Sequence, residues 1–305
     1  MKYFFIVGEV SGDLLASKVV EKLSEMDIDA QFYGSGGERM RREGVELTVD
    51  IKQMAFMGLA EVLKNIFRVW RNFRVLKKSI LEINPDVIVL VDYPGFNLRM
   101  AKWAKSKGFK VAYYVAPKVW AWKENRVRRI KKYVDVLMVI LPFEKEFFEK
   151  HEVSTVYVGH PLLELIPPPK EGHVKDKIAL LPGSRKQEIE RMLPVMLKAM
   201  YLEGSVDKLV VAGLSEFGTE YYEKIIEGRA ELVMDQVYEI LDESKLAIVA
   251  SGTASLEAAL KMVPQVVCYA VHPFTYWIAK LLVKVNYISL VNLIMKSPVV
   301  PEVIQ

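Results

Sequence analysis

The chain has 305 residues, of which 51% are hydrophobic and 26% are charged, and its formal net charge is +4. This composition is typical of a globular protein and excludes an intrinsically disordered chain, and the length is enough for two domains. The only cysteine, Cys268, lies in an apolar run, so we expect a buried reduced thiol and a cytoplasmic protein. No stretch approaches the roughly 20 apolar residues that cross a bilayer, and we expect the mature chain to start at Met1.

Short β-rich runs alternate with helical patterns along the first half of the chain. We expect strands at residues 3–7, 30–33, 87–91, 110–115, 136–141 and 155–158. Several of these runs end at Gly, Pro or Asp and are followed by a helical pattern, which is typical of right-handed βαβ units. The first half is therefore predicted to form a parallel sheet covered by helices.

A proline-rich segment at 166–176 cannot continue a helix or a central strand, and we interpret it as a linker between residues 1–165 and residues 177–305. Beyond it we expect strands at 178–181, 208–212, 231–234, 246–250 and 265–269. The predicted fold class is α/β, with two Rossmann-like, doubly wound domains. Such domains bind ligands at the carboxyl ends of their strands, so we expect a site in a cleft between them.

The first loop of interest follows the first predicted strand. Gly8 and Gly12 let backbone amides approach a ligand, and the N-terminus of the following helix favours a phosphate or a polarised sugar. We expect Ser11 or Asp13 to cap a helix that begins at Leu14. A plain strand-to-helix turn is the alternative, and the spacing is not that of the dinucleotide-binding fingerprint.

A second loop, formed by Gly183, Ser184 and Arg185, follows the first predicted strand of the second domain. The glycine permits close approach of a ligand, and the serine can donate a hydrogen bond. The arginine offers a bidentate fork suited to a pyrophosphate. We predict that this loop binds the diphosphate of a nucleotide.

A third loop, formed by Ser251, Gly252 and Thr253, precedes a helical pattern that contains Glu257. Its hydroxyls and free amides face one helix terminus, and the glutamate can accept hydrogen bonds from ribose hydroxyls. A capping serine and a solvated glutamate are the alternative. Three loops of this kind together favour a nucleotide-sugar site over ordinary turns.

Asp92 ends the apolar run 87–91 and is the candidate catalytic base, because partial burial there would raise its proton affinity. An aspartate that starts the Pro-Gly turn by bonding its own backbone is the alternative. His160 is a second candidate base, although a structural histidine at a turn explains it better. Without an HExxH motif, and with one cysteine and four scattered histidines, we predict neither a metal nor a cofactor.

Between residues 59 and 78, positive charges recur every three or four residues beside aromatic side chains. This pattern is typical of a helix on an anionic membrane surface, and a core-facing amphipathic helix is the alternative. The residues predicted to dock on the membrane are Ile66, Phe67, Arg68, Trp70, Arg71 and Phe73. A second basic cluster at 120–132 suits a phosphorylated glycolipid or a nucleic acid, and the low net charge disfavours nucleic acid. An amphipathic segment at 273–285 is expected to pack in the core or between domains.

At these motifs the sequence resembles the lipid A disaccharide synthase family over nearly the whole chain. The matching segments are 8–13, 36–40, 57–62, 92–97, 114–122, 141–144, 159–161, 180–185, 251–257 and 287–292. The resemblance implies two domains of the glycosyltransferase B type. It also implies an enzyme attached peripherally to the cytoplasmic face of the inner membrane, with the basic helix as its docking surface.

The resemblance implies transfer of 2,3-diacylglucosamine from its UDP donor to 2,3-diacylglucosamine 1-phosphate, which gives the β-1',6-linked disaccharide and UDP. One-step displacement of an axial UDP group would invert the linkage. By family analogy Asp92 is the essential acid near the acceptor hydroxyl, and the UDP site includes Arg185, Glu257 and Asn292. The residues expected at the acceptor are Glu9, Ser11 and Gly12, with Glu9 as another candidate base.

Two departures from the family pattern affect these expectations. Gly95 stands where many members carry a second acid, so Asp92 is expected to act alone. The chain ends at Gln305, where relatives continue into helices that support dimer contacts, so we expect either a truncated chain or a minimal member, and a homodimer is in doubt. The alternatives are another UDP-sugar transferase, an epimerase, or a truncated form that binds UDP or lipid without turnover.

Overall fold

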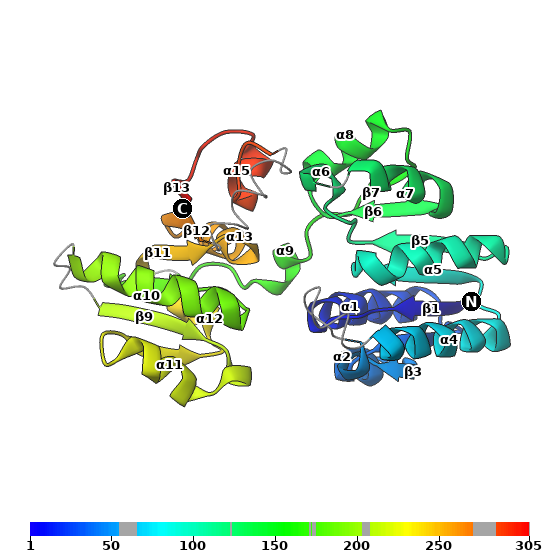
Figure 1. Cartoon of the computed structure of the whole chain (residues 1–305), viewed down its shortest axis with the longest axis horizontal. Coiled ribbons are helices and arrows are strands. Elements are labelled where there is room, and N and C mark those ends of the chain that lie inside the picture. The colour runs from blue at the N-terminus through cyan, green and yellow to red at the C-terminus, as the bar shows by residue number, and fades with distance from the viewer. Residues whose placement is uncertain are drawn as a thin grey trace. The chain divides into compact units, whose positions relative to one another are not determined.

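The computed structural model of the chain describes residues 1–54, 66–122, 124–170, 172, 175–202, 208–270 and 285–304. Its backbone contacts divide the chain into two compact units, Met1–His160 and Pro161–Gln305 (Figure 1). This division falls a few residues before the segment that the sequence suggests as a linker. Residues 59–65 of the predicted basic helix and residues 273–284 of the predicted amphipathic segment lie outside the described part.

Unit 1 contains a sheet whose described strands are all parallel, in the order β3-β2-β1-β4-β5-β6-β7. The strands are β1 (Lys2–Ile6), β2 (Gln31–Gly36), β3 (Glu46–Asp50), β4 (Val87–Val91), β5 (Lys110–Tyr114), β6 (Val136–Val139) and β7 (Thr155–Tyr157). The described helices are α1 (Val10–Met26), α2 (Glu38–Arg42), η1 (Ile51–Gln53), α4 (Ile66–Ile83), α5 (Pro94–Ser106), α6 (Val119–Trp122), η2 (Glu124–Arg126), α7 (Val127–Tyr133) and α8 (Pro142–Lys150).

Both faces of the first sheet are buried, which explains the nearly continuous apolar runs of its central strands. Side chains alternate between the two faces along a strand. In β1, Phe4 and Ile6 pack with Leu76 of α4 on one face, whereas Phe5 packs with Val20 of α1 on the other.

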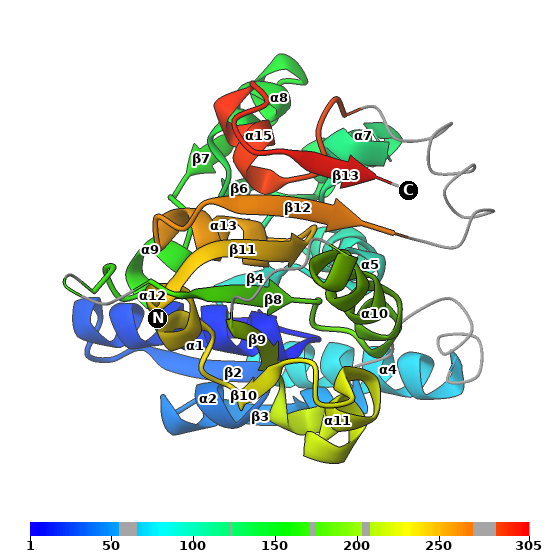
Figure 2. The same cartoon turned by 90° about the vertical axis from the view of Figure 1, so that its left-hand side faces the viewer.

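Unit 2 repeats this plan, and its described strands are also all parallel, in the order β10-β9-β8-β11-β12-β13 (Figure 2). The strands are β8 (Lys177–Leu181), β9 (Lys208–Gly213), β10 (Glu231–Met234), β11 (Ser244–Ala250), β12 (Gln265–Tyr269) and β13 (Glu302–Ile304). The described helices are α9 (Leu162–Leu165), α10 (Lys186–Leu202), η3 (Ser215–Phe217), α11 (Thr219–Ile226), α12 (Val237–Asp242), α13 (Thr253–Leu260) and α15 (Leu290–Met295). The predicted class of two Rossmann-like α/β domains is confirmed.

Each sheet has one point at which the strand order reverses. In unit 1 this switch point lies between β1 and β4, and in unit 2 it lies between β8 and β11. The connections that follow the two strands at a switch point run toward opposite edges of the sheet. The loops at the carboxyl ends of these two strands are therefore left open for a ligand.

Two strands, β3 and β13, were not expected from the sequence. Both are short strands at the edge of their sheet, where only one neighbour contributes hydrogen bonds. Edge strands need fewer apolar residues than central ones, so the pattern Glu-Leu-Thr-Val-Asp of β3 resembles a loop.

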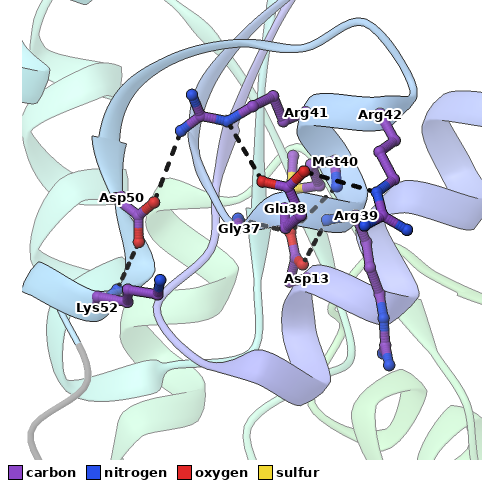
Figure 3. Close-up of polar contacts among 9 residues, drawn as sticks. All are labelled: Asp13, Gly37, Glu38, Arg39, Met40, Arg41, Arg42, Asp50 and Lys52. Carbon is purple, nitrogen blue, oxygen red and sulfur yellow. Dashed lines mark hydrogen bonds and ion pairs between the residues drawn. The ribbon is translucent and has the colours of Figure 1, made fainter.

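The expected cap of the first helix is wrong. Helix α1 begins at Val10 rather than at Leu14, and Asp13 lies within its first turn. The buried Asp13 carboxylate instead accepts hydrogen bonds from the backbone amides of Gly37 (2.6 Å), Arg39 (3.2 Å) and Met40 (3.3 Å) (Figure 3). Because these amides open α2, Asp13 caps the second helix and fastens it to the first.

A buried ion pair in unit 2 fixes the proline-rich segment that leads into the second sheet. The Lys261 ammonium is fully buried and lies 2.7 Å from the Asp242 carboxylate. The same ammonium donates to the carbonyls of Pro167 and Pro168 at 3.2 Å, and Asp242 accepts from the amide of Lys170 at 3.1 Å. The pair thus satisfies backbone groups of a segment that has no regular structure of its own.

We expect Lys261→Ala to destabilise unit 2 by about 3–5 kcal/mol, because it leaves the Asp242 charge buried without its partner. Urea unfolding followed by circular dichroism measures the change. The matched control is Lys208→Ala, which removes an exposed pair with Asp176 and should cost less than about 1 kcal/mol. Equal effects of the two substitutions would contradict this assignment.

Candidate active site

The loops singled out in the sequence flank the two switch points. In unit 1 they follow β1 and β4, which pair with each other. In unit 2 they follow β8 and β11, which also pair. The structure therefore brings the predicted acceptor loop next to Asp92, and the predicted diphosphate loop next to the loop that starts at Ser251.

Asp92 and Tyr93 follow β4 with left-handed backbone angles, φ +43° and φ +48°. Side-chain-bearing residues rarely adopt this conformation, and it persists only where the surroundings hold it. The Asp92 amide donates to the Tyr114 carbonyl at 3.0 Å. The Asp92 carbonyl accepts from the Tyr113 hydroxyl at 2.5 Å and from the Asn97 side-chain amide at 2.8 Å. Both polar groups of this peptide segment are thus fixed, and the carboxylate is held at the strand end.

The loop after β1 packs against the residue that follows Asp92. A Cβ at Gly8 would lie 2.5 Å from the Tyr93 ring, so only glycine fits here. The Tyr93 hydroxyl donates to the Met54 carbonyl at 3.0 Å. Glu9 is half-buried and close enough to raise the pKa of Tyr93, after the larger effect of burial. Gly8 therefore serves close packing between the two loops of the switch point.

The other two residues of the predicted acceptor loop differ from each other. Ser11 is exposed in the first turn of α1. Gly12 is buried, and a Cβ there would lie 2.9 Å from the Val7 side chain, so this glycine lets α1 approach the sheet. Contact of either residue with an acceptor stays a prediction.

Burial raises the pKa of Asp92 above the ordinary value of 3.8, and the Lys118 ammonium opposes part of this effect. A carboxylate with raised proton affinity is a better base. His160 responds in the opposite sense, because burial, assisted by Lys118, lowers its pKa to about 4. At neutral pH this histidine is therefore uncharged and only weakly basic.

Glu144 is a buried acid in unit 1 to which the sequence analysis gave no role. Its carboxylate accepts from the Trp120 indole at 2.9 Å and from the Leu141 amide at 3.1 Å, and burial raises its pKa. Glu144 is the third residue of α8, and its carboxylate caps the N-terminus of this helix. The Trp120 ring also packs edge-on against Phe143, so Glu144 positions α6 against α8.

In the diphosphate loop, Gly183 has φ +113°, a conformation that favours glycine. Ser184 and Arg185 are exposed just before α10. The Arg185 guanidinium lies 2.8 Å from the Glu188 carboxylate, which also accepts from the Ser184 amide at 3.3 Å. The groups predicted to bind the diphosphate are therefore exposed, and they already bind the Glu188 carboxylate.

The loop after β11 leads directly into α13. The Ser251 hydroxyl donates to the Ile288 carbonyl at 2.9 Å, whereas Thr253 is exposed. Glu257 is half-buried, and one of its oxygens accepts from the Tyr238 hydroxyl at 3.3 Å. Burial raises the pKa of Glu257, and burial together with Glu257 raises the pKa of Tyr238 to about 12. Within the described part of the chain, its other oxygen accepts no hydrogen bond and could meet a ligand hydroxyl.

A cavity of about 200 Å³ lies at the carboxyl ends of β8, β11 and β12. It includes Arg185 and Ser251, two of the predicted nucleotide ligands. The remaining lining residues are Gln187, Glu188, Arg191, Met192, Ala250, Cys268, Tyr269 and Ala270. Two arginines in one cavity favour an anionic ligand.

Asn292 is almost fully buried, and its side chain is occupied within the protein. Its amide nitrogen donates to the Val300 carbonyl at 2.9 Å and to the Glu302 carboxylate at 2.8 Å, and its oxygen accepts from the Val300 amide at 2.9 Å. The same Glu302 carboxylate accepts from the Ser289 amide at 2.9 Å. Asn292 lies in α15, and its side chain fixes the segment that follows this helix and leads into β13.

Helix α4 presents part of the predicted docking face. Phe67 and Trp70 are 85% and 60% exposed, and Arg68 and Arg71 are exposed beside them. Phe73 was expected on this face, but its ring packs edge-on against Phe96 of α5 at 5.2 Å. Phe73 is half-buried because it lies on the inward side of the helix. Ile66 is the first residue of α4.

No described helix is long and apolar enough to span a membrane. Across the described ranges, His, Cys, Asp and Glu side chains form no group of three or more that could hold a metal ion.

Two solved structures share this arrangement of two Rossmann-like units. One is UDP-GlcNAc 2-epimerase from Neisseria meningitidis bound to UDP-GlcNAc, with a TM-score of 0.62 and 12% identity over 97% of this chain and 90% of that chain. The other is the glycotransferase of kitacinnamycin, with a TM-score of 0.58 and 11% identity over 89% of this chain and 81% of that chain. The fold class is thus that of nucleotide-sugar epimerases and glycosyltransferases of the B type.

Sequence similarity identifies the family within this class. A family model described as lipid-A-disaccharide synthetase matches residues 3–305. The lipid-A-disaccharide synthase of Myxococcus xanthus (strain DK1622) is 41% identical over 324 residues, which cover 98% of this chain and 82% of that protein. The chain belongs to the lipid-A-disaccharide synthetase family. The predicted glycosyltransferase activity, formation of the lipid A disaccharide, is confirmed at this level.

The position of Cys268 in the cavity gives a direct test of ligand binding in unit 2. Burial raises the pKa of this thiol, so alkylation by iodoacetamide should be slow at neutral pH and accelerate as the pH rises. Saturating UDP should slow the alkylation by about tenfold or more if it fills the cavity. Inorganic phosphate at equal ionic strength should leave the alkylation rate unchanged.

Because Cys268 is the only cysteine, mass spectrometry of the intact chain follows this reaction without interference. An alkylation rate that UDP leaves unchanged, at a concentration that saturates its binding, would place the nucleotide elsewhere.

Proposed function

We propose that the chain transfers 2,3-diacylglucosamine from its UDP donor to 2,3-diacylglucosamine 1-phosphate, with formation of the β-1',6-linked disaccharide and UDP. The observation that carries this proposal is the placement of Asp92 at the switch point of unit 1, with its backbone fixed and its pKa raised by burial. A sugar hydroxyl is a weak nucleophile, so the reaction needs such a base.

The Asp92 carboxylate accepts the proton of the acceptor hydroxyl while the hydroxyl oxygen forms a bond to the anomeric carbon of the donor. The bond from that carbon to the UDP oxygen breaks in the same step, and UDP leaves with the electron pair. Attack opposite the leaving group inverts the configuration and needs no covalent intermediate. Gly95 is exposed beside this site and carries no side chain, so Asp92 acts without a second acid at that position.

Unit 2 holds the nucleotide in this proposal. Ser184, Arg185 and the first amides of α10 receive the diphosphate and stabilise the charge that develops on UDP. Glu257 accepts from the ribose through the oxygen that Tyr238 leaves available. Gly183, Gly252, Ser251 and Thr253 complete this site, whereas Asn292 acts by positioning the segment after α15.

The acceptor side of the site lies in unit 1. Glu9 and Ser11 stand at the start of α1, with Glu9 close to Tyr93 and therefore to Asp92. Gly12 contributes by allowing α1 to approach the sheet. The homodimer stays a prediction.

The acyl chains of both substrates reside in a membrane, and α4 is the surface proposed to meet it. Phe67 and Trp70 insert at the interface, while Arg68 and Arg71 bind anionic headgroups. The Arg74 guanidinium stacks on the Trp70 ring at 5.2 Å and adds a further charge to the same face. The enzyme would act in this way as a peripheral protein of the cytoplasmic face of the inner membrane.

The reaction is tested by incubating the chain with both proposed substrates in detergent and a metal chelator, and by detecting the disaccharide and UDP by mass spectrometry. We expect the wild type to form product and Asp92→Asn to lose at least about 100-fold in kcat while its affinity for UDP is unchanged, since the substitution removes only the base. The acid limb of kcat/KM should lie above the ordinary aspartate pKa of 3.8, because the raised pKa leaves Asp92 protonated and inactive below it.

His160→Gln is the control in this assay, because it changes a nearby titratable residue of unit 1 to which the proposal gives no part in the proton transfer. Near-normal turnover of Asp92→Asn would remove the role proposed for this carboxylate. Saturable UDP binding without any product from the wild type would instead favour a form that binds nucleotide without turnover.

Membrane docking is tested by flotation with vesicles that contain phosphatidylglycerol. Phe67→Ser combined with Trp70→Ser should weaken binding by more than about tenfold, because two aromatic side chains no longer enter the interface. Arg68→Gln combined with Arg71→Gln should weaken binding at low salt and reduce its salt dependence.

The control for the docking experiment is Ile28→Ser, which removes a 93% exposed apolar side chain of unit 1 outside α4. Vesicle binding that falls equally in this variant would show that any exposed apolar residue contributes and would argue against a docking face on α4.

A further inference from the structure

We propose that the Glu188 carboxylate is an internal substitute for the diphosphate. In the free enzyme it occupies the anion-binding groups of the loop after β8, and it must leave them before a nucleotide binds. This inference rests on the proposed function, because it takes the loop Gly183, Ser184 and Arg185 as the diphosphate site. Glu188 is a positioning residue in this inference: it holds Arg185 in the free enzyme and gives way when the diphosphate binds.

The geometry places both oxygens of Glu188 on groups that would otherwise meet an anion. One oxygen lies 2.8 Å from the Arg185 guanidinium, and the other accepts from the Ser184 amide at 3.3 Å. The second oxygen also lies against Gly183, where an added Cβ would be only 2.7 Å from it. The carboxylate therefore makes the three kinds of contact expected of a bound phosphate: a guanidinium, a backbone amide and a bare glycine.

A glutamate three residues into a helix commonly bonds back to a backbone amide as part of a helix cap. Such a cap explains the contact with the Ser184 amide but not the ion pair with Arg185. Glu188 also lines the cavity of unit 2 together with Arg185 and Ser251, and this cavity is the space proposed for the nucleotide. A diphosphate in that space would meet a negative charge unless Glu188 moves away.

This arrangement has two consequences for the reaction. The ion pair neutralises Arg185 in the empty enzyme, so a monovalent anion gains less by entering the loop than a diphosphate that offers several oxygens. After transfer, the carboxylate competes with UDP for Arg185 and favours release of the product. Glu188 thereby lowers the affinity for the nucleotide and speeds the release of UDP.

The test compares Glu188→Gln with the wild type by isothermal titration with UDP, UMP and uridine. The substitution keeps a hydrogen-bond acceptor near the Ser184 amide and removes the competing charge. We expect UDP to bind roughly two- to fivefold more tightly, UMP to gain less, and uridine to be unchanged, since an exposed pair of this kind has a modest strength. UDP should become a stronger product inhibitor by the same factor.

Glu190→Gln is the matched control, because it removes the same charge from an exposed position on the same helix. Glu188→Ala provides a second variant, and thermal unfolding of each variant identifies any loss of stability. A merely structural cap would lower stability in Glu188→Ala and leave the ratios between the UDP, UMP and uridine affinities as in the wild type.

The outcomes separate this inference from the proposed function. Unchanged or weaker UDP binding in both variants, with UDP binding in the wild type that depends on Arg185, would overturn the role of Glu188 alone. Absence of UDP binding in the wild type would overturn both. A gain for UDP that is matched by an equal gain for uridine would also overturn the inference, because uridine carries no charge to compete with.

Discussion

The structure depends on one topological constraint, the reversal of strand order at a single point in each parallel sheet. Parallel strands need helical crossovers, and at the reversal these crossovers leave in opposite directions. The loops that follow β1 and β4 in unit 1, and β8 and β11 in unit 2, are therefore not covered by these crossovers. Asp92, Arg185 and Glu257 each belong to such a loop or to the helix that follows it.

At the first switch point, the chain keeps a carboxylate in place through backbone strain that its neighbours offset. Two consecutive non-glycine residues, Asp92 and Tyr93, have left-handed angles, and Val115 at the end of the adjacent strand β5 has φ +61°. Each such residue costs of order 1–3 kcal/mol. The hydroxyl of Tyr113 and the amide of Asn97 bind the Asp92 carbonyl and help to offset this cost.

The sequence predicted the central strands well because both faces of each sheet are buried, which leaves unbroken apolar runs such as β4. From the end of such a run, the location of Asp92 followed directly. Side-chain direction was harder to predict: Asp13 was assigned to the wrong helix, and Phe73 to the wrong side of α4, because both depend on where a neighbouring element lies.

Residues that act through contacts between side chains gave weaker signals. Glu188 reads as an ordinary charged residue on a helix, and only its distance from Arg185 reveals the competing charge. Asn97 and Glu144 lie in segments that resemble the family, yet no local pattern tells that each holds a neighbouring backbone group. The single sequence therefore located the central strands and the loops that follow them, but not the side-chain partners within those loops.

Aromatic packing joins the proposed docking helix to the catalytic loop. Phe73 of α4 contacts Phe96 of α5 at 5.2 Å, and Phe96 stacks on Tyr93 at 5.7 Å. Tyr93 directly follows Asp92, so packed aromatic rings separate the proposed docking helix from the proposed base. With α4 docked on a bilayer, this packing would set the height of the carboxylate above the lipid surface. The enzyme would then select the acceptor hydroxyl by its depth in the headgroup layer as well as by its chemistry.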